Sequence, residues 1–177
     1  MARINDVEIK NLKSFMGSEG WCSQGNVYLN RKKLGFWSQD GRGGSDVFEF
    51  DESLLSEAAE NFKAGFPDTY AYKEFCDAET LMYKLAELKE IETACKKDFR
   101  NGYNAVIVVT DSIHQGMLAV ASDSSDSELL RKYADVIADM MANLCRDIEP
   151  RIKVFRPNGF DITIDATHPA EDFFMND

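Results

Sequence analysis

Two histidines and four cysteines are the only imidazole and thiol side chains in this chain of 177 residues, which leaves few ligands for zinc and few nucleophiles. The cysteines are far apart, and no two of them have the CxxC spacing of a metal or redox site. The N-terminal residues contain no apolar stretch of signal-peptide length, and no run approaches the ~18 apolar residues that cross a bilayer. We therefore expect a cytoplasmic protein with free thiols and no membrane partner.

Basic residues are also scarce, since 20 of them face 31 acidic residues and the formal net charge is -11. A chain of this charge repels nucleic acid and anionic lipid at long range, which predicts no direct nucleic-acid partner. Most acidic residues are mixed with Lys and Arg, but they are in local excess at residues 122–128 and 161–177. Two interpretations stay open: these acids only keep the protein soluble, or they form a negative surface that meets a basic protein.

The first fifty residues have the pattern of β-strands, with apolar and polar side chains in alternation. A polar turn at residues 30–33 separates two such runs, which predicts a β-hairpin. The predicted strands are residues 7–10, 26–29, 34–37 and 47–50. Together they predict an antiparallel meander with one face buried.

Apolar side chains at three- and four-residue spacing predict helices at residues 53–64, 78–99 and 126–148. Ser125 and Glu128 have capping-box spacing at the start of the third, long amphipathic helix.

Between the second and third helices, residues 104–110 and 116–121 predict a buried strand pair. Residues 152–164 contain a turn signal at 157–159 and predict a C-terminal β-hairpin. This order of elements predicts an α+β fold. We expect residues 1–177 to form a single compact unit, the alternative being a division into residues 1–110 and 111–177.

A glycine-rich loop at residues 38–46 (SQDGRGGSD) is the most distinctive local feature. Gly41, Gly43 and Gly44 allow a backbone that presents several N–H groups to an anion, with Arg42 beside them. The loop lacks the GxxxxGK[ST] spacing and does not lead from a strand into a helix, so it is not a nucleotide-binding loop of that type. It is either a contact loop or a tight bend between two strands.

Chemistry beyond binding finds little support in the sequence. His168 has Asp161, Asp165, Glu171 and Asp172 as sequence neighbours, and such side chains can hold a divalent ion. However, no EF-hand, HExxH or GxSxG motif is present, so we expect no metal, cofactor or catalytic residue. A thiol–imidazole pair would need the fold to bring distant residues together; the candidates are Cys22, Cys145 and His114.

Aromatic side chains in the first half of the chain are the remaining clue. Trp21, Tyr70 and Tyr72 would anchor a protein interface if they were exposed. The ordinary role of such side chains is core packing.

Residues 26–29 (NVYL), 32–35 (KKLG) and 38–44 (SQDGRGG) resemble a group of largely uncharacterised small proteins from bacteriophages and other mobile elements. In that group a hairpin leads into a loop of the form N-D-G-x-G-G; here Gln39 replaces the usual Asn, and Ser45 follows where Cys is frequent. The resemblance weakens through residues 81–110. It implies a phage or mobile-element context in which small acidic proteins often occupy a host defence protein, as anti-CRISPR and anti-restriction proteins do.

We therefore expect a non-enzymatic, acidic interaction protein that binds and inhibits or modulates a nucleic-acid-handling host protein with a basic surface. The predicted contact residues are Asp40, Gly41, Arg42, Gly43, Gly44, Asp123, Asp126, Asp161 and Asp165. Two alternatives stay open. One is a metal-assisted hydrolase of a nucleotide or phosphate ester, with the glycine loop on the phosphate and Asp161, Asp165 or His168 on the metal. The other is a small-molecule or nucleotide-binding module.

Overall fold

The computed structural model describes residues 1–66, 68, 73–110, 115–143 and 151–170, and in these it contains four α-helices and two β-sheets. The predicted α+β class is confirmed. The chain divides into two compact units: unit 1 is Met1–Glu92 with Asp161–Pro169, and unit 2 is Thr93–Phe160 with Ala170–Asp177. The division falls inside helix α2 (Ala78–Arg100) rather than near residue 110.

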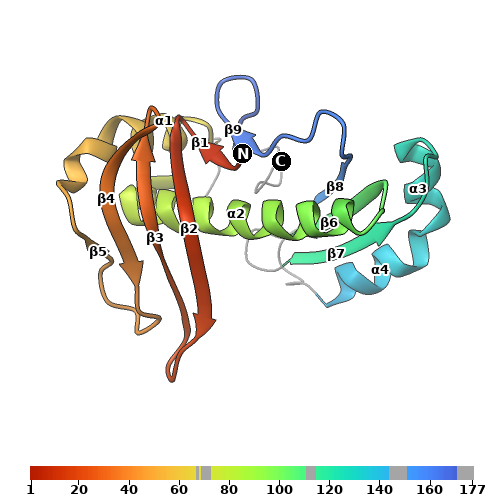
Figure 1. The fold of residues 1–177 in the computed structure, drawn as a ribbon, viewed down its shortest axis with the longest axis horizontal. Helices are drawn as coiled ribbons and strands as arrows, with labels where there is room; N and C mark the ends of the chain where they lie inside the picture. The colour runs from red at the N-terminus through yellow and green to blue at the C-terminus, as the bar shows by residue number, and fades with distance from the viewer. Residues whose placement is uncertain (67, 69–72, 111–114, 144–150, 171–177) are drawn as a thin grey trace. The chain divides into compact units, whose positions relative to one another are not determined.

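Unit 1 is built on a six-stranded sheet in the order β5-β4-β3-β2-β1-β9 (Figure 1). Its strands are β1 (Arg3–Ile4), β2 (Val7–Met16), β3 (Trp21–Leu29), β4 (Lys32–Gln39), β5 (Val47–Phe48) and β9 (Thr163–Ile164). Strands β2 to β5 are antiparallel neighbours in chain order, which confirms the predicted meander.

The hairpin between β3 and β4 turns on two residues, because Leu29 pairs directly with Lys32. Asn30 and Arg31 both have positive φ, 50° and 67°. This is the backbone of the two-residue turns that match the twist of antiparallel strands, and asparagine accepts it more readily than most residues. The predicted hairpin is thus confirmed, with a turn shorter than the four residues expected.

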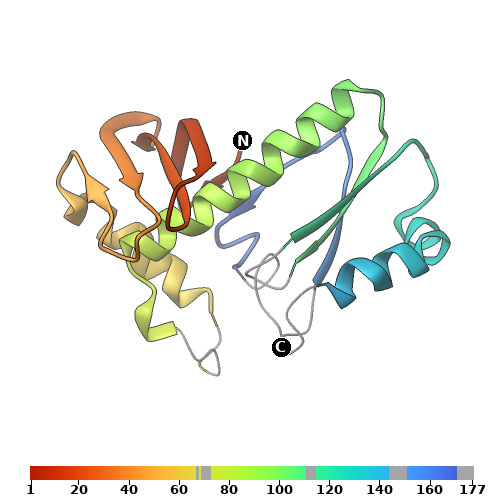
Figure 2. The same ribbon diagram turned by 90° about the horizontal axis from the view of Figure 1, so that it is seen from below.

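One face of this sheet carries the core of unit 1. Ile9, Val27 and Trp37 point to that face and are buried. Helices α1 (Ser56–Ala64) and α2 lie on this side of the sheet in Figures 1 and 2, and Phe62 and Leu85 are among their buried side chains. No helix of unit 1 covers the opposite face in the described part of the chain.

The first α-helix begins at Ser56, three residues later than the predicted start at residue 53. A 3-10 turn, η1 (Glu52–Leu55), precedes α1, and the Asp51 carboxylate caps it by accepting a hydrogen bond from the Ser53 N–H. Leu54, an apolar residue of the predicted helix 53–64, is 49% exposed, because the tighter 3-10 turn shifts it off the α-helical face. A second short 3-10 turn, η2 (Lys73–Phe75), leads toward α2.

Unit 2 contains a three-stranded antiparallel sheet in the order β7-β6-β8. The strands are β6 (Ala105–Thr110), β7 (Gln115–Val120) and β8 (Arg151–Phe155). Strand β6 is central and buried, as its β-branched sequence predicts, and β7 is its neighbour. Helices α3 (Asp126–Lys132) and α4 (Ala134–Ala142) cover one face of the sheet (Figure 2), and the core includes Ile107, Leu129 and Ile137.

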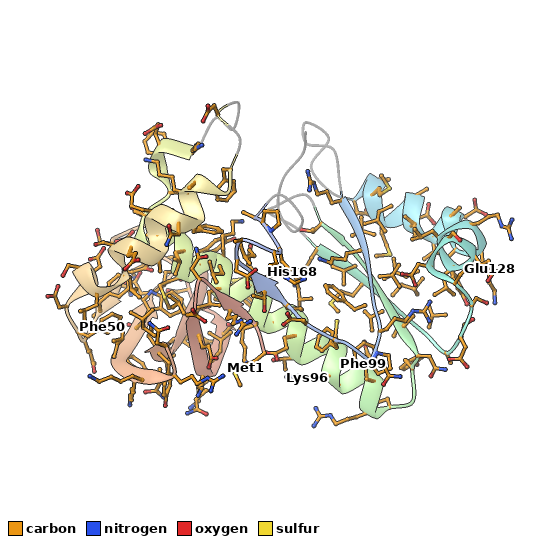
Figure 3. All side chains as sticks on the ribbon, turned by 90° about the horizontal axis from the view of Figure 1, so that it is seen from above. Met1, Phe50, Lys96, Phe99, Glu128 and His168 are labelled. Atoms are coloured by element: carbon orange, nitrogen blue, oxygen red, sulfur yellow. The ribbon has the colours of Figure 1, made fainter. Side chains whose placement is uncertain are left out.

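The end of α2 contributes aromatic packing to unit 2. Phe99, labelled in Figure 3, packs edge to face with Phe160 at a centroid distance of 5.3 Å. Phe160 makes a similar contact with Phe155 of β8 at 5.6 Å. These rings connect the helix, the strand and the segment that follows it.

The prediction of one long helix over residues 126–148 is wrong in the described residues. The helix is interrupted at Tyr133, whose φ and ψ are -107° and 20°, and α3 and α4 are its two parts. Both parts face the same core cluster. The spacing of apolar residues indicates which side chains are buried. The same spacing is compatible with one straight helix and with two successive helices. Residues 144–150 lie outside the described residues.

The predicted C-terminal β-hairpin is also wrong. Strand β8 pairs with β6 in the sheet of unit 2, whereas β9 pairs in parallel with β1 in unit 1. Arg3 and Asn5 donate backbone hydrogen bonds to the Ile162 and Ile164 carbonyls at 3.1 Å and 3.0 Å. Turn residues indicate that the chain changes direction, but they do not determine which strand edge accepts the following segment.

None of the described helices is both long enough and apolar enough to span a membrane.

Candidate functional site

The glycine loop packs on the end of the β2–β3 hairpin, and we call this assembly the hairpin tip (residues 15–22 and 40–44). Gly41 has a φ of 74°, and a Cβ atom at this position would lie 2.7 Å from the Gly20 carbonyl carbon. A Cβ atom on Gly20 would in turn lie 2.4 Å from the Gly41 oxygen. The two backbones therefore approach more closely than any side chain would allow.

Hydrogen bonds fix the same contact. The Cys22 thiol, which is buried, donates to the Asp40 carbonyl at a distance of 3.0 Å. The hairpin closes with a hydrogen bond of 2.8 Å from the Gly17 N–H to the Gly20 carbonyl. The tip is therefore an ordered unit, and Cys22 acts within it as a packed donor.

The charged residues of the loop bind each other or a near neighbour. Asp40 accepts a hydrogen bond from the Arg42 N–H at 3.0 Å, and the Arg42 guanidinium lies 3.7 Å from the Glu19 carboxylate. The Arg42 N–H is therefore already bound to the Asp40 carboxylate, whereas an anion-binding loop would present this N–H to its ligand. Gly43 and Gly44 have no atom within 4 Å of a Cβ position. The tight-bend interpretation accounts for this geometry, with Gly43 and Gly44 at the open side of the bend.

Large apolar side chains are exposed at the hairpin tip. The exposed fractions are 52% for Phe15, 68% for Met16 and 49% for Trp21. Met16 pairs directly with Trp21, so both lie on one face of the hairpin, and Phe15 pairs with Cys22 on the other face. Exposed apolar side chains therefore lie on both faces at the end of the hairpin.

Trp21 is exposed, as an interface anchor must be. Tyr70 and Tyr72 lie outside the described residues. Phe15 and Met16 were missed. In the sequence, these two apolar residues come just before the Gly-Ser-Glu-Gly turn at residues 17–20. They end β2, a strand of ten residues that extends beyond the core.

A buried tryptophan anchors the far end of the glycine loop. The Trp37 indole N–H donates to the Asp46 carboxylate at 2.6 Å, and the Asp46 N–H donates to the Glu79 carboxylate at 3.0 Å. Desolvation raises the pKa of Asp46 to about 6; the Trp37 hydrogen bond opposes this rise, and the nearby charge of Glu79 adds to it. The loop is thus connected to α2 through a carboxylate that titrates above its ordinary range.

The predicted contact residues of unit 2 have internal partners. Arg156 donates through Nε and Nη2 to the Asp126 carboxylate at 3.1 Å and 2.8 Å, and through Nη1 to the Ser122 carbonyl at 3.1 Å. Asp123 accepts a hydrogen bond from the Asn104 amide at 2.6 Å. Arg156 therefore holds the acidic loop against the segment after β8.

The capping box is present as predicted at the start of α3, where Glu128 is labelled in Figure 3. Ser125 accepts a hydrogen bond from the Glu128 N–H, and the Glu128 carboxylate accepts one from the Ser125 N–H. Much of the acidic sequence at residues 122–128 thus has a local structural role.

Asp161 and Asp165 hydrogen-bond within their own turns. Thr163 donates its hydroxyl to Asp161 at 2.7 Å, and Thr167 donates both its hydroxyl and its N–H to Asp165 at 2.7 Å and 2.9 Å. Desolvation would raise the pKa of Asp165, but the hydrogen bonds from Thr167 and His168 lower it overall. These aspartates stabilise the segment around β9.

The residues considered for catalysis are not brought together where they are described. Within the described ranges, no three histidine, cysteine, aspartate or glutamate side chains are arranged to hold a metal ion. His168 lies 3.7 Å from Asp165 and 2.9 Å from the Thr167 hydroxyl. Cys145 and His114 lie outside the described residues, as do Glu171 and Asp172.

The structure therefore leaves the hairpin tip as the best candidate site. Its backbone is fixed by the close Gly20–Gly41 contact, its large side chains are exposed, and its chemistry is that of a contact surface. Comparison with known proteins adds no identification, because no family model, no curated protein sequence and no solved structure matches this chain.

Proposed function

We propose that this protein acts by binding another protein through the hairpin tip. The observation that supports this most directly is the exposure of Phe15, Met16 and Trp21 on a backbone fixed by the Gly20–Gly41 contact. Aromatic side chains are enriched at the energetic centres of interfaces. A surface that is ordered before binding loses less conformational entropy on association than a flexible loop does.

The charge next to the tip favours a basic partner. Residues 46–62, which follow the glycine loop directly, contain six acidic residues and no basic ones. The net charge of -11 acts in the same direction and would accelerate association with a positive surface. A nucleic-acid-handling host protein, inhibited or modulated by this chain as in the anti-defence proteins of mobile elements, fits that description.

A binding assay with tip variants tests this proposal. The wild-type chain, immobilised, is offered a panel of purified bacterial nucleases and other nucleic-acid-binding enzymes. We expect it to retain at least one of them, and to lose it in the double variant Phe15→Ser with Trp21→Ser. Raising the salt concentration should weaken the complex, since screening reduces the attraction between charged surfaces.

Phe75 provides the matched control, because it is 72% exposed in unit 1 but is not part of the hairpin tip. Phe75→Ser should retain the partner as the wild type does. Circular dichroism should show that all variants fold alike, since the substituted side chains are exposed. Retention that survives the double variant, or a panel with no salt-sensitive partner, would contradict the proposal.

A further inference from the structure

The face of the unit 1 sheet opposite the core has a composition that differs from the rest of the chain. Residues on this outer face follow from the strand register: Lys10 lies opposite Asn26, Lys13 opposite Gln24, and Lys33 opposite Tyr28. Lys10, Asn26, Gln24 and Tyr28 are half-buried, and Lys13 and Lys33 are exposed. Figures 1 and 2 show α1 and α2 on the other side of these strands.

Lysines and aromatic rings share this outer face with one carboxylate, that of Glu8, which lies opposite Tyr28. The Lys10 ammonium lies 4.2 Å from the centre of the Tyr28 ring and 3.6 Å from the Glu8 carboxylate. Phe36, opposite Asn26 on the next strand, places a second half-buried ring on the same face. The amides of Asn26 and Gln24 lie between the charged and aromatic groups. The outer face therefore offers three lysines against one glutamate, together with ring surfaces and hydrogen-bonding groups.

Charge is also divided between the strands and the rest of unit 1. Residues 1–39, which form β1 to β4, contain six basic and three acidic residues, a net side-chain charge of +3. Residues 40–92 contain five basic and fourteen acidic residues, a net charge of -9. At physiological salt the Debye length is about 8 Å, so a ligand in contact with the sheet responds mainly to the charges near it. The charge of the whole chain predicts repulsion of nucleic acid at long range, but it does not describe this face.

We propose that the outer face of the unit 1 sheet binds single-stranded nucleic acid. Lys10, Lys13 and Lys33 would contact phosphates, and unstacked bases would lie on Tyr28 and Phe36. Single strands fit better than a duplex, because only unpaired bases expose their ring faces for stacking on aromatic side chains. Binding moves the Lys10 ammonium from the Tyr28 ring to a phosphate and so opens that ring. This goes beyond the proposed protein contact, since it is centred on Tyr28 and Phe36, which lie outside the hairpin tip.

Fluorescence anisotropy with labelled oligothymidylate of about 20 nucleotides tests the proposal on the full chain. At physiological salt we expect saturable binding with a Kd of roughly 1–100 μM, the range of non-specific complexes, and tighter binding at lower salt. Three phosphate contacts predict a slope of about -2 for log affinity against log salt, at about 0.7 per contact for single strands. Tyr28→Ala and Phe36→Ala should each weaken binding by about tenfold. The triple variant Lys10→Ala, Lys13→Ala and Lys33→Ala should abolish the salt dependence.

Control ligands and variants separate this proposal from its rivals. Glu57→Gln, which changes an exposed charge on α1, should leave the affinity nearly unchanged. Heparin has negative charge but no bases, so it should bind more weakly than oligothymidylate. Tyr28→Ala and Phe36→Ala should leave its affinity unchanged. Trp21→Ser, which changes the opposite face of the hairpin, should still bind oligothymidylate, so failure here and failure of the protein contact are distinguishable.

Two results would overturn the inference. One is the absence of binding to oligothymidylate at about 20 mM salt, where electrostatic attraction is strongest. The other is equal affinity for heparin, duplex and single strand with no effect of Tyr28→Ala or Phe36→Ala, which would mean that only diffuse charge is involved.

Discussion

The glycine loop of unit 1 and the serine-rich acidic loop of unit 2 are fixed in opposite ways. In the first, residues 40–44 approach another backbone directly, with Gly41 against Gly20 and almost no side chain between them. In the second, residues 122–126 are held by one long side chain, Arg156, that reaches two carbonyls and a carboxylate. The first mechanism depends on the absence of a Cβ atom, and the second depends on charge and hydrogen-bond geometry.

The difference shows that charge alone does not distinguish a free surface residue from one already bound within the chain. In both loops the aspartates accept hydrogen bonds from near neighbours, so a conspicuous acidic or glycine-rich sequence marks an ordered bend. At the hairpin tip, by contrast, large apolar side chains such as Met16 and Trp21 remain exposed. Exposure of large apolar groups is therefore the more informative signal for a contact site here.

The largest expected effect comes from Gly41→Ala. Its Cβ atom would lie within 2.9 Å of three backbone atoms of residues 20 and 21, and φ is 74°. We expect a loss of about 3 kcal/mol or more in the free energy of unfolding, measured by urea denaturation.

Gly43→Ala is the matched control, since φ is 76° and the Cβ position has open space. Only the backbone strain should remain, costing about 1 kcal/mol. Equal losses for the two variants would show that the contact between the loop and the hairpin contributes nothing.

Arg156→Ala should destabilise the acidic loop of unit 2 by about 2 kcal/mol, because it removes charged hydrogen bonds to Ser122, Ser124 and Asp126 together. Asp126→Asn should cost less than about 1 kcal/mol, since this carboxylate is half exposed and the backbone contacts survive. Arg156→Lys should not restore stability, because an ammonium cannot reproduce the planar set of donors. Full rescue by lysine would mean that charge rather than geometry holds this loop.

Asp46→Asn should change how stability depends on pH. The pKa of Asp46 is raised from 3.8 to about 6 in the folded state, so its protonated form favours folding, and this contribution is lost as the pH rises through about 6. Compared with the wild type, the asparagine variant should therefore gain stability between about pH 4 and pH 7, as urea denaturation at several pH values would show.

Glu79→Gln extends the same test. The negative charge of Glu79 helps to raise the pKa of Asp46, so the variant should lower that pKa. In this variant the pH-dependent loss of stability should move to lower pH. Identical pH profiles for wild type and Asp46→Asn would contradict the coupling between the loop end and α2.

A smaller effect than that of Arg156→Ala is expected for Ser125→Ala at the start of α3. Removing the capping hydroxyl leaves the Glu128 N–H without its acceptor and should cost about 1 kcal/mol. Ser127→Ala, two residues further along the chain, should change the free energy of unfolding by less than about 0.5 kcal/mol. Thermal unfolding of both variants would show whether the cap matters as much as the Arg156 contacts.

Features set by neighbouring residues were predictable. Asn30 and Arg31 make the expected hairpin turn, Ser125 and Glu128 make the expected capping box, and β6 is buried as its composition indicates. Features that depend on distant partners were not. The pairing of β9 with β1 joins residues about 160 positions apart, and no local pattern specifies it.

The candidate site was predictable only in part, for the same reason. Trp21 was identified as a conditional anchor, whereas Phe15 and Met16 were not, because strand alternation gives the face of a residue but not where the core ends. The aspartates of the predicted contact set look alike in sequence. Their hydrogen bonds to Arg42, Arg156 and Thr167 appear only in the folded chain.

The sequence by itself determined the α+β class, the strand meander and the positions of the helices, because hydrophobic period, turn residues and caps act over a few residues. Tertiary structure alone decided which strands share a sheet, where the long helix breaks and which polar groups are already bound. Those outcomes depend on packing between segments far apart in the chain, where shape and hydrogen-bond satisfaction select one arrangement among many that the local pattern permits.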